Sequence, residues 1–138
     1  MVTVNDCRII GLPRISSKEG NLTPVYGNIH IPFEIKRVYY VYDIPGGESR
    51  GGHAHKDSLE FIISVMGSFD VLINDGNRQR TVTLNRAYFG LYIPNLIWRE
   101  LLNFSSGAIC FVITSSLFSE ADYIRDYRDF VKQIKHME

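Results

Sequence analysis

The stretch Arg50-Gly-Gly-His-Ala-His-Lys-Asp-Ser-Leu-Glu-Phe-Ile-Ile-Ser-Val-Met-Gly67 contains a His-x-His pair, followed after four residues by Glu60. On a β-strand, residues two apart point to the same face of the sheet. His53 and His55 are therefore predicted to enter one cavity side by side. Imidazole exchanges protons near neutral pH, which suits general acid or base catalysis. The alternative is a pair of polar core residues that neighbouring groups satisfy.

The spacing H-x-H-x4-E-x6-G resembles the first sequence motif of the cupin superfamily, and every position of that motif is present. The resemblance implies a small antiparallel β-barrel or jelly roll whose two His and one Glu usually bind a metal. The second cupin motif, P-x-G-x2-H-x3-N, matches the stretch from Pro94 to Asn103, but Leu96 replaces the Gly and Arg99 replaces the third His. Because a permanent cation repels a divalent metal, the sequence resembles a cupin whose metal site has become an acid–base and anion-handling site.

The composition is that of a globular enzyme or binding protein. A length of 138 residues predicts one domain, 1–138, and 45% hydrophobic residues are enough for a packed core. A formal net charge of +0 gives no reason to expect nucleic acid or an anionic membrane as a partner. The two cysteines, Cys7 and Cys110, lack CxxC spacing and are expected to be reduced thiols of a cytoplasmic protein.

Short β-rich segments follow one another along most of the chain. Such spacing predicts an all-β sandwich or small barrel. The Asn74-Asp-Gly-Asn77 stretch favours a tight hairpin, because Asp-Gly tolerates positive φ. Pro13 to Asn21 is predicted to be a loop. Strands are predicted at 7–12, 22–26, 29–31, 35–43, 59–66, 69–73, 78–84, 88–93, 97–102 and 109–114.

The C-terminal segment changes to helical spacing. Ser119 with Asp122 resembles a capping box, and apolar residues from Tyr123 to Ile134 recur every three or four positions. One helix of about 15 residues, starting at Ser119, is predicted to pack on the outside of the barrel.

Five more candidates have side chains suited to the same cavity. Tyr39 shares a strand face with Arg37, and a phenol near an imidazole can donate to a ketone oxygen. Arg37 and Arg50 are candidate phosphate ligands, because guanidinium forms two parallel hydrogen bonds with phosphate. Arg99 is predicted either to bind substrate or to pair with Glu60 or Glu100. Glu60 is predicted either to bind a metal or to orient a histidine.

Several longer stretches resemble a narrower group, the dTDP-4-keto-6-deoxyglucose 3,4-ketoisomerases of the WxcM-like cupins. The resemblance runs nearly from end to end of the chain. The blocks that carry it are Ile31-Pro-Phe-Glu-Ile-Lys-Arg-Val-Tyr-Tyr40, Arg50-Gly-Gly-His-Ala-His-Lys56, Gly67-Ser-Phe-Asp-Val71 with Asp75-Gly76, Gly90-Leu-Tyr-Ile-Pro-Asn-Leu-Ile-Trp98 and Asp122-Tyr-Ile-Arg-Asp-Tyr127.

This resemblance implies an isomerase that uses neither metal nor cofactor and moves the keto group of dTDP-4-keto-6-deoxyglucose from C4 to C3. The 3-keto product would supply 3-amino-3,6-dideoxyhexoses for surface polysaccharides such as O-antigen. The catalytic residues implied are His53, His55 and Tyr39, and the division of work between the two histidines is left open.

The resemblance also bears on stereochemistry and assembly. Two positions that differ between relatives with gluco and galacto products match Glu19 and Arg99. Arg99 resembles the gluco type, whereas Glu19 matches neither type, and relatives often carry Gln where this chain has Glu60. A homodimer with an exchanged N-terminal strand is implied as well.

Three other functions are considered. A nucleotide-sugar 3,5-epimerase would also remove protons next to the ketone but would leave the carbonyl in place. A metal-dependent cupin enzyme would use His53, His55 and Glu60 as ligands. A non-catalytic sugar-binding cupin would keep the barrel without acid–base chemistry.

Overall fold

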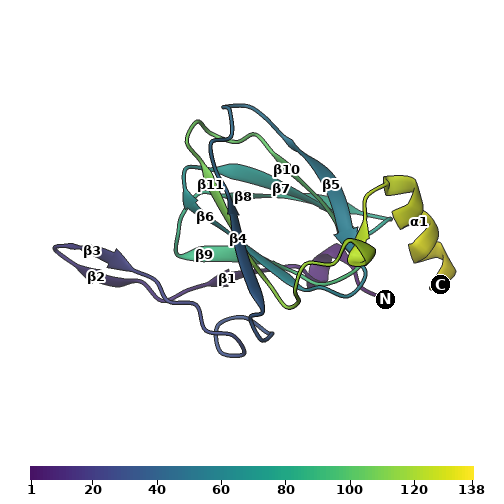
Figure 1. Cartoon of the computed structure of the whole chain (residues 1–138), viewed down its shortest axis with the longest axis horizontal. Coiled ribbons are helices and arrows are strands. Elements are labelled where there is room, and N and C mark those ends of the chain that lie inside the picture. The colour runs from purple at the N-terminus through teal and green to yellow at the C-terminus, as the bar shows by residue number, and fades with distance from the viewer.

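The computed structural model describes residues 1–138 and consists mainly of antiparallel strands. One five-stranded sheet has the order β1-β9-β6-β11-β4, and a second has the order β12-β5-β10-β7-β8. Figure 1 shows the two sheets curving around a common interior. The elements are η1 (Val4–Asp6), β1 (Arg8–Gly11), β2 (Ile15–Ser17), β3 (Gly20–Leu22), β4 (Arg37–Val41), β5 (Arg50–His55), β6 (Glu60–Met66), β7 (Phe69–Asn74), β8 (Gln79–Leu84), β9 (Phe89–Ile93), β10 (Trp98–Leu102), β11 (Ile109–Thr114), η2 (Glu120–Asp122), β12 (Tyr123–Ile124) and α1 (Tyr127–His136).

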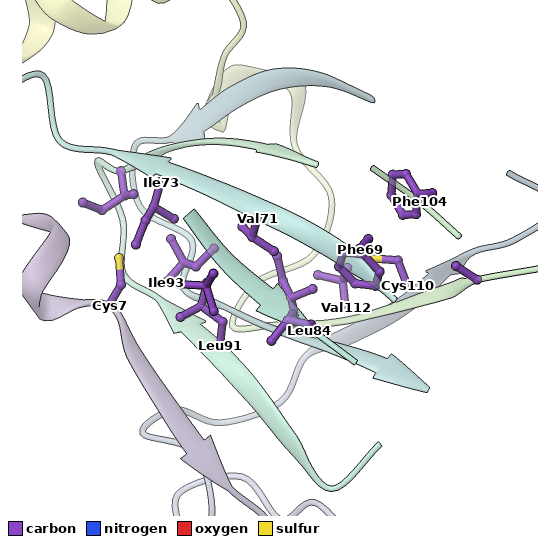
Figure 2. Close-up of a cluster of buried hydrophobic side chains, with 14 of the residues drawn as sticks. Cys7, Phe69, Val71, Ile73, Leu84, Leu91, Ile93, Phe104, Cys110 and Val112 are labelled. Carbon is purple, nitrogen blue, oxygen red and sulfur yellow. The ribbon is translucent and has the colours of Figure 1, made fainter. Parts of the chain in front are cut away.

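The main core fills the space between the two sheets. Side chains of β7 and β8 meet side chains of β9 and β11, as Figure 2 shows for Val71, Leu84, Leu91 and Val112. All four are nearly or fully buried. This packing confirms the predicted all-β barrel of the cupin type, and the free, buried Cys7 and Cys110 belong to the same core.

Strand β6 is buried on both faces, which explains its continuous apolar sequence. Ile62 points into the main core, whereas Phe61 and Ile63 belong to a second cluster with Ile31 and Phe33 on the outside of the first sheet. The alternation that places Phe61 and Ile63 outside also places Glu60 on the inner face with Ile62. The hydrophobic run thus carries one ionisable group into the barrel interior.

The hairpin at Asn74–Asn77 is confirmed. It joins β7 to β8 in full register from Phe69↔Leu84 to Asn74↔Gln79, and Gly76 has φ +90°. The Asp75 side chain accepts hydrogen bonds from the backbone N–H groups of Asn77 and Arg78, which fixes the turn.

The N-terminal prediction was wrong in detail. The predicted loop 13–21 contains β2 and the turn into β3, where Gly20 adopts φ +133°. The predicted strands 22–26 and 29–31 are absent beyond Leu22, because Ile29 and His30 both donate backbone hydrogen bonds to Tyr26 O and turn the chain. In Figure 1 the β2–β3 hairpin projects away from the barrel.

The C-terminal helix exists, but its predicted start was wrong. Asp126 is the N-cap and accepts a hydrogen bond from the Arg128 N–H, so α1 begins at Tyr127 and has 10 residues. Ser119 precedes only the short η2 turn and makes no side-chain cap. The intervening residues form β12, which pairs with β5 through Tyr123↔His55 and Ile124↔Ala54.

Helix α1 packs on the outer face of the second sheet. Phe130 and Ile134 are buried against Trp98, Ala54 and Ile124. The outer face of β5 is thereby covered at Ala54, and its inner face presents the two flanking histidines. No helix of the chain has the length and apolar character that crossing a membrane would require.

Candidate active site

A cavity of about 690 Å³ lies against the inner faces of the strands and is lined by His53. Strand β4 contributes Arg37 and Tyr39, strand β5 contributes Arg50 and His53, and the adjacent strands contribute the remaining lining. The lining residues are Arg37, Tyr39, Val41, Ser49, Arg50, Gly51, Gly52, His53, Glu60, Ile62, Arg99, Leu101, Val112, Tyr123 and Arg125.

A buried ion pair lies at the base of the cavity. Arg99 Nη1 donates to Glu60 Oε1 at 2.6 Å, and Arg99 Nη2 donates to the carbonyl of Ile97 at 2.9 Å. Both charged side chains are almost fully buried. Of the alternatives considered for Arg99, the structure contains the pair with Glu60, whereas Glu100 accepts from the indole of Trp98 instead.

His55 lies between two carboxylates. Its Nδ1 is 2.8 Å from Asp122 Oδ2, and its Nε2 is 3.2 Å from Glu60 Oε2. The second distance is within ion-pair range, but Nε2 forms no well-aligned hydrogen bond. The ring therefore has one firm polar contact, to Asp122, and one looser contact, to Glu60.

His53 has a different environment. Its ring meets the His55 ring edge-on at a centroid distance of 4.9 Å, and its buried Nε2 has no hydrogen-bond partner. Burial, followed by the nearby Arg99 guanidinium, lowers the pKa of His53 to about 3. At neutral pH His53 is therefore an uncharged imidazole with an unpaired nitrogen, which is the state a base needs.

Glu60 and Tyr39 complete the interior. Burial alone would raise the pKa of Glu60, but Arg99 and His55 outweigh it and hold that pKa well below its usual value. Burial, and next the Glu60 charge, raises the pKa of Tyr39 far above its ordinary value. The phenol donates to Glu60 Oε2 at 3.4 Å and stays protonated, so it can serve as a hydrogen-bond donor.

The three residues of the metal motif do not fit a metal here. Donor atoms of His53, His55 and Glu60 lie within 4.8 Å of one another. However, Arg99 already occupies one oxygen of Glu60, and its positive charge would face any cation placed in the cluster. No step of the proposed mechanism therefore runs through a metal.

The structure brings together seven of the eight predicted site residues. Tyr39, His53, Glu60, Arg99, Arg37 and Arg50 line the cavity, and His55 lies directly behind it. Glu19 does not join them within one chain, because it lies in the turn between β2 and β3.

Sequence reasoning missed three residues near the site. Asp122 contacts His55, Tyr123 packs against both histidine rings, and the Arg125 guanidinium lies 4.2 Å from the Tyr123 ring centroid. All three lie in the Asp122–Tyr127 block that the resemblance singled out. The sequence pattern places them within the predicted C-terminal helix, because the apolar spacing that starts at Tyr123 continues into α1.

A barrel interior with an uncharged histidine beside buried carboxylates and a protonated phenol defines an acid–base enzyme of the cupin class. The chain belongs to the family described as FdtA, WxcM-like, C-terminal, whose sequence model matches residues 5–135. This membership confirms the predicted family, and the chain is an isomerase.

Named relatives agree with this assignment. The TDP-4-oxo-6-deoxy-alpha-D-glucose-3,4-oxoisomerase of Aneurinibacillus thermoaerophilus is 39% identical over 127 residues, which cover 92% of this chain and 91% of the relative. The WlaRB TDP-quinovose 3,4-ketoisomerase of Campylobacter jejuni is 42% identical, with a TM-score of 0.88 over 92% of this chain and 98% of the other.

A third relative was solved with a sugar nucleotide. It is a mutant of the 3,4-ketoisomerase QdtA of Thermoanaerobacterium thermosaccharolyticum in complex with TDP-4-keto-6-deoxyglucose. It is 34% identical, with a TM-score of 0.92 over 99% of this chain and 97% of the other.

Proposed function

We propose that this chain converts TDP-4-keto-6-deoxyglucose into the 3-keto isomer. The observation that carries the proposal is the uncharged His53, with an unpaired Nε2, in the same cavity as the protonated Tyr39 phenol. A relative solved with this sugar nucleotide supports the choice of substrate. The cavity of about 690 Å³ lies within the range of ligand pockets.

The reaction needs only proton transfers. His53 removes the proton from C3, and the electron pair forms a C3–C4 double bond as the C4 oxygen gains a proton. Loss of the proton from the C3 oxygen then forms the new ketone, and His53 returns a proton to C4. The substrate and product have the same atoms and the same overall oxidation state, so no redox cofactor is needed.

Tyr39 and His55 are assigned to the oxygens. The Tyr39 phenol is a donor that stabilises negative charge on an enolate oxygen, and His55 Nε2 can exchange a proton with an oxygen. Arg37 and Arg50 at the cavity wall are proposed to bind the diphosphate, because both present guanidinium groups there. The product is proposed to keep the gluco configuration at C4, on the resemblance of Arg99.

We also infer a homodimer. Strands β2 and β3 are exposed throughout, and Ile15 and Leu22, which pair across them, are each 59% exposed. A two-stranded hairpin alone is marginally stable in water. Covering by a second copy of the chain, with exchange of the N-terminal strands, would bury this surface. The supply of 3-amino-3,6-dideoxyhexoses and the cytoplasmic location stay predictions.

The test is incubation with TDP-4-keto-6-deoxyglucose in D₂O containing EDTA, followed by proton NMR. We expect loss of the C3 proton signal and appearance of a C3 ketone, with a C4 coupling typical of the gluco configuration. His53→Asn should lose turnover while still binding TDP, and His136→Asn, on the exposed end of α1, is the matched control. Exchange at C3 and C5 without carbonyl migration would indicate a 3,5-epimerase instead. Absence of any change would contradict the proposal.

A further inference from the structure

Asp122 contacts His55 from outside the cavity. Its Oδ2 lies 2.8 Å from His55 Nδ1, on the opposite side of the ring from Glu60. The Asp122 side chain is 12% exposed and does not line the cavity. The His55 ring lies between Asp122 and Glu60, and Glu60 lines the cavity, so any effect of Asp122 on the reaction must pass through His55.

The Asp122 carboxylate is itself held in place. Ser58 Oγ donates to Oδ2 at 2.6 Å, and the Asp57 backbone N–H donates to Oδ1 at 2.7 Å. Ser58 also contacts the Ser116 hydroxyl, and the Lys56 N–H donates to the Asp122 carbonyl at 2.8 Å. Because both oxygens have donors from fixed positions, the carboxylate cannot rotate freely.

The charge of this carboxylate decides which nitrogen of His55 carries a proton. Burial would raise the pKa of Asp122, but the hydrogen bonds from Ser58, Asp57 and His55 outweigh it and keep that pKa below its usual value. An ionised carboxylate only accepts hydrogen bonds. His55 Nδ1 must therefore be a protonated donor, which leaves Nε2, directed at Glu60 on the cavity wall, as the nitrogen whose proton can move.

We propose that Asp122 is a positioning residue that fixes the tautomer and ring orientation of His55, so that Nε2 is the nitrogen that exchanges protons with the substrate oxygens. The proposal rests on the proposed function. The comparable arrangement in metal sites and in catalytic triads fixes a histidine through its second nitrogen. Here the second nitrogen is Nδ1, and the supporting hydroxyl is Ser58.

A purely structural role for Asp122 would give a different outcome. The same hydrogen bonds tie the η2 turn to the loop at 56–58, so the alternative role for Asp122 is that of an anchor for β12 alone. An anchor would affect the free energy of unfolding and substrate binding. A positioning residue would affect the His55 tautomer and kcat, with little effect on KM.

The test compares Asp122→Asn with Asp57→Asn in the full chain. Asp57 is exposed and its side chain contacts nothing in the site, so its substitution removes a neighbouring charge without touching His55. The tautomer is measured by ¹⁵N–¹H correlation NMR of histidine-labelled, ligand-free protein, with the His55 signals identified by their loss in His55→Asn. Turnover is measured by the proton NMR assay.

We expect a protonated Nδ1 at His55 in the wild type and in Asp57→Asn, and loss of that single tautomer in Asp122→Asn. The kcat of Asp122→Asn should fall by about 10- to 100-fold with KM nearly unchanged. Ser58→Ala should show a smaller change in the same direction. An unchanged His55 tautomer in Asp122→Asn, or a wild-type His55 whose Nδ1 carries no proton, would overturn the proposal.

The proposed ketoisomerase function and the positioning role of Asp122 can be contradicted independently of each other. A wild-type chain without ketoisomerase activity would contradict the proposed function, whereas the tautomer comparison in ligand-free protein still decides whether Asp122 positions His55. A folded, active Asp122→Asn with wild-type kcat would overturn the positioning role while the proposed function stands.

Discussion

His53 and His55 show how two identical side chains acquire different chemistry two residues apart. His55 is bracketed by the carboxylates of Asp122 and Glu60. His53 faces the cavity without a hydrogen-bond partner at Nε2, and the nearby positive charge of Arg99 adds to the effect of burial. The environment of each ring is supplied by other segments of the chain. It therefore makes His53 a free base and holds His55 in one orientation.

The depressed pKa of His53 predicts a loss of stability in mild acid. Unfolded His53 takes up a proton below its ordinary pKa of 6.5, whereas folded His53 stays uncharged down to about pH 3. The unfolded state binds more protons in this window, so the free energy of unfolding falls as pH falls from 6.5 toward 3. Between neutral pH and about pH 5 this contribution amounts to at most about 2 kcal/mol.

Urea unfolding of the wild type and of His53→Asn, at neutral pH and at about pH 5, measures the contribution of His53 to the free energy of unfolding. We expect the variant to lose less stability on acidification than the wild type. His136→Asn should behave like the wild type, because His136 is exposed at the end of α1, away from the cavity. Equal losses in wild type and His53→Asn would contradict the prediction.

Strand β5 is the element that places the site. Its inner face carries His53 and His55, and its outer face carries Ala54 beneath α1. On one side it pairs with β10, where Arg99 lies opposite His53, and on the other with β12, where Tyr123 lies opposite His55. The position of the histidines thus depends on close packing of β5 against both neighbours.

At Gly52 the backbone of β5 lies very close to the side chain of Trp98. A Cβ at Gly52 would lie 2.6 Å from Trp98 Cε2 and 2.7 Å from Trp98 Nε1. Trp98 is buried under α1 and has little room to move. Gly52→Ala is therefore expected to lower the free energy of unfolding by about 1–3 kcal/mol.

Gly51→Ala is the matched control, because a Cβ at Gly51 meets no atom within 4 Å. Its urea midpoint is expected to stay close to that of the wild type. A Gly52→Ala variant as stable as Gly51→Ala would show that Trp98 moves aside without cost.

At the scale of the whole molecule, the barrel closes around one core and leaves the cavity at one end. The outer face of the first sheet is different, because it exposes Val38, Tyr40, Val65 and Met66. The β2–β3 hairpin follows β1, an edge strand of the same sheet, and lies outside the barrel in Figure 1. Exposed apolar surface of this kind marks an interface in many proteins.

The homodimer predicts a particle of twice the 15.8 kDa chain mass in size-exclusion chromatography with light scattering. Ile15→Lys combined with Leu22→Lys should produce monomers, because both side chains would carry charge into the proposed interface. Met137→Lys adds a charge at a comparably exposed apolar position, 52% exposed at the end of α1, and should leave the dimer intact. A wild-type monomer would refute the inference.

Much of the fold could be predicted from local sequence. The period-two pattern of β4, the Asp-Gly turn between β7 and β8 and the apolar run of β6 each depend on neighbours in sequence, and the structure confirms them. The His-x-His spacing likewise places both imidazoles on one strand face, because that depends only on the geometry of β5. Amphipathic spacing also predicted a C-terminal helix, and α1 confirms it.

Only the tertiary structure decided the partners of these groups. The pairing of Glu60 with Arg99 joins strands 39 residues apart, and Asp122 reaches His55 across 67 residues. The start of α1 was misplaced because β12 continues the apolar spacing of the helix, and pairing with β5 overrides that local pattern. Local spacing determined which residues face inward, whereas the charge and tautomer of each histidine depend on contacts that form only when distant strands meet.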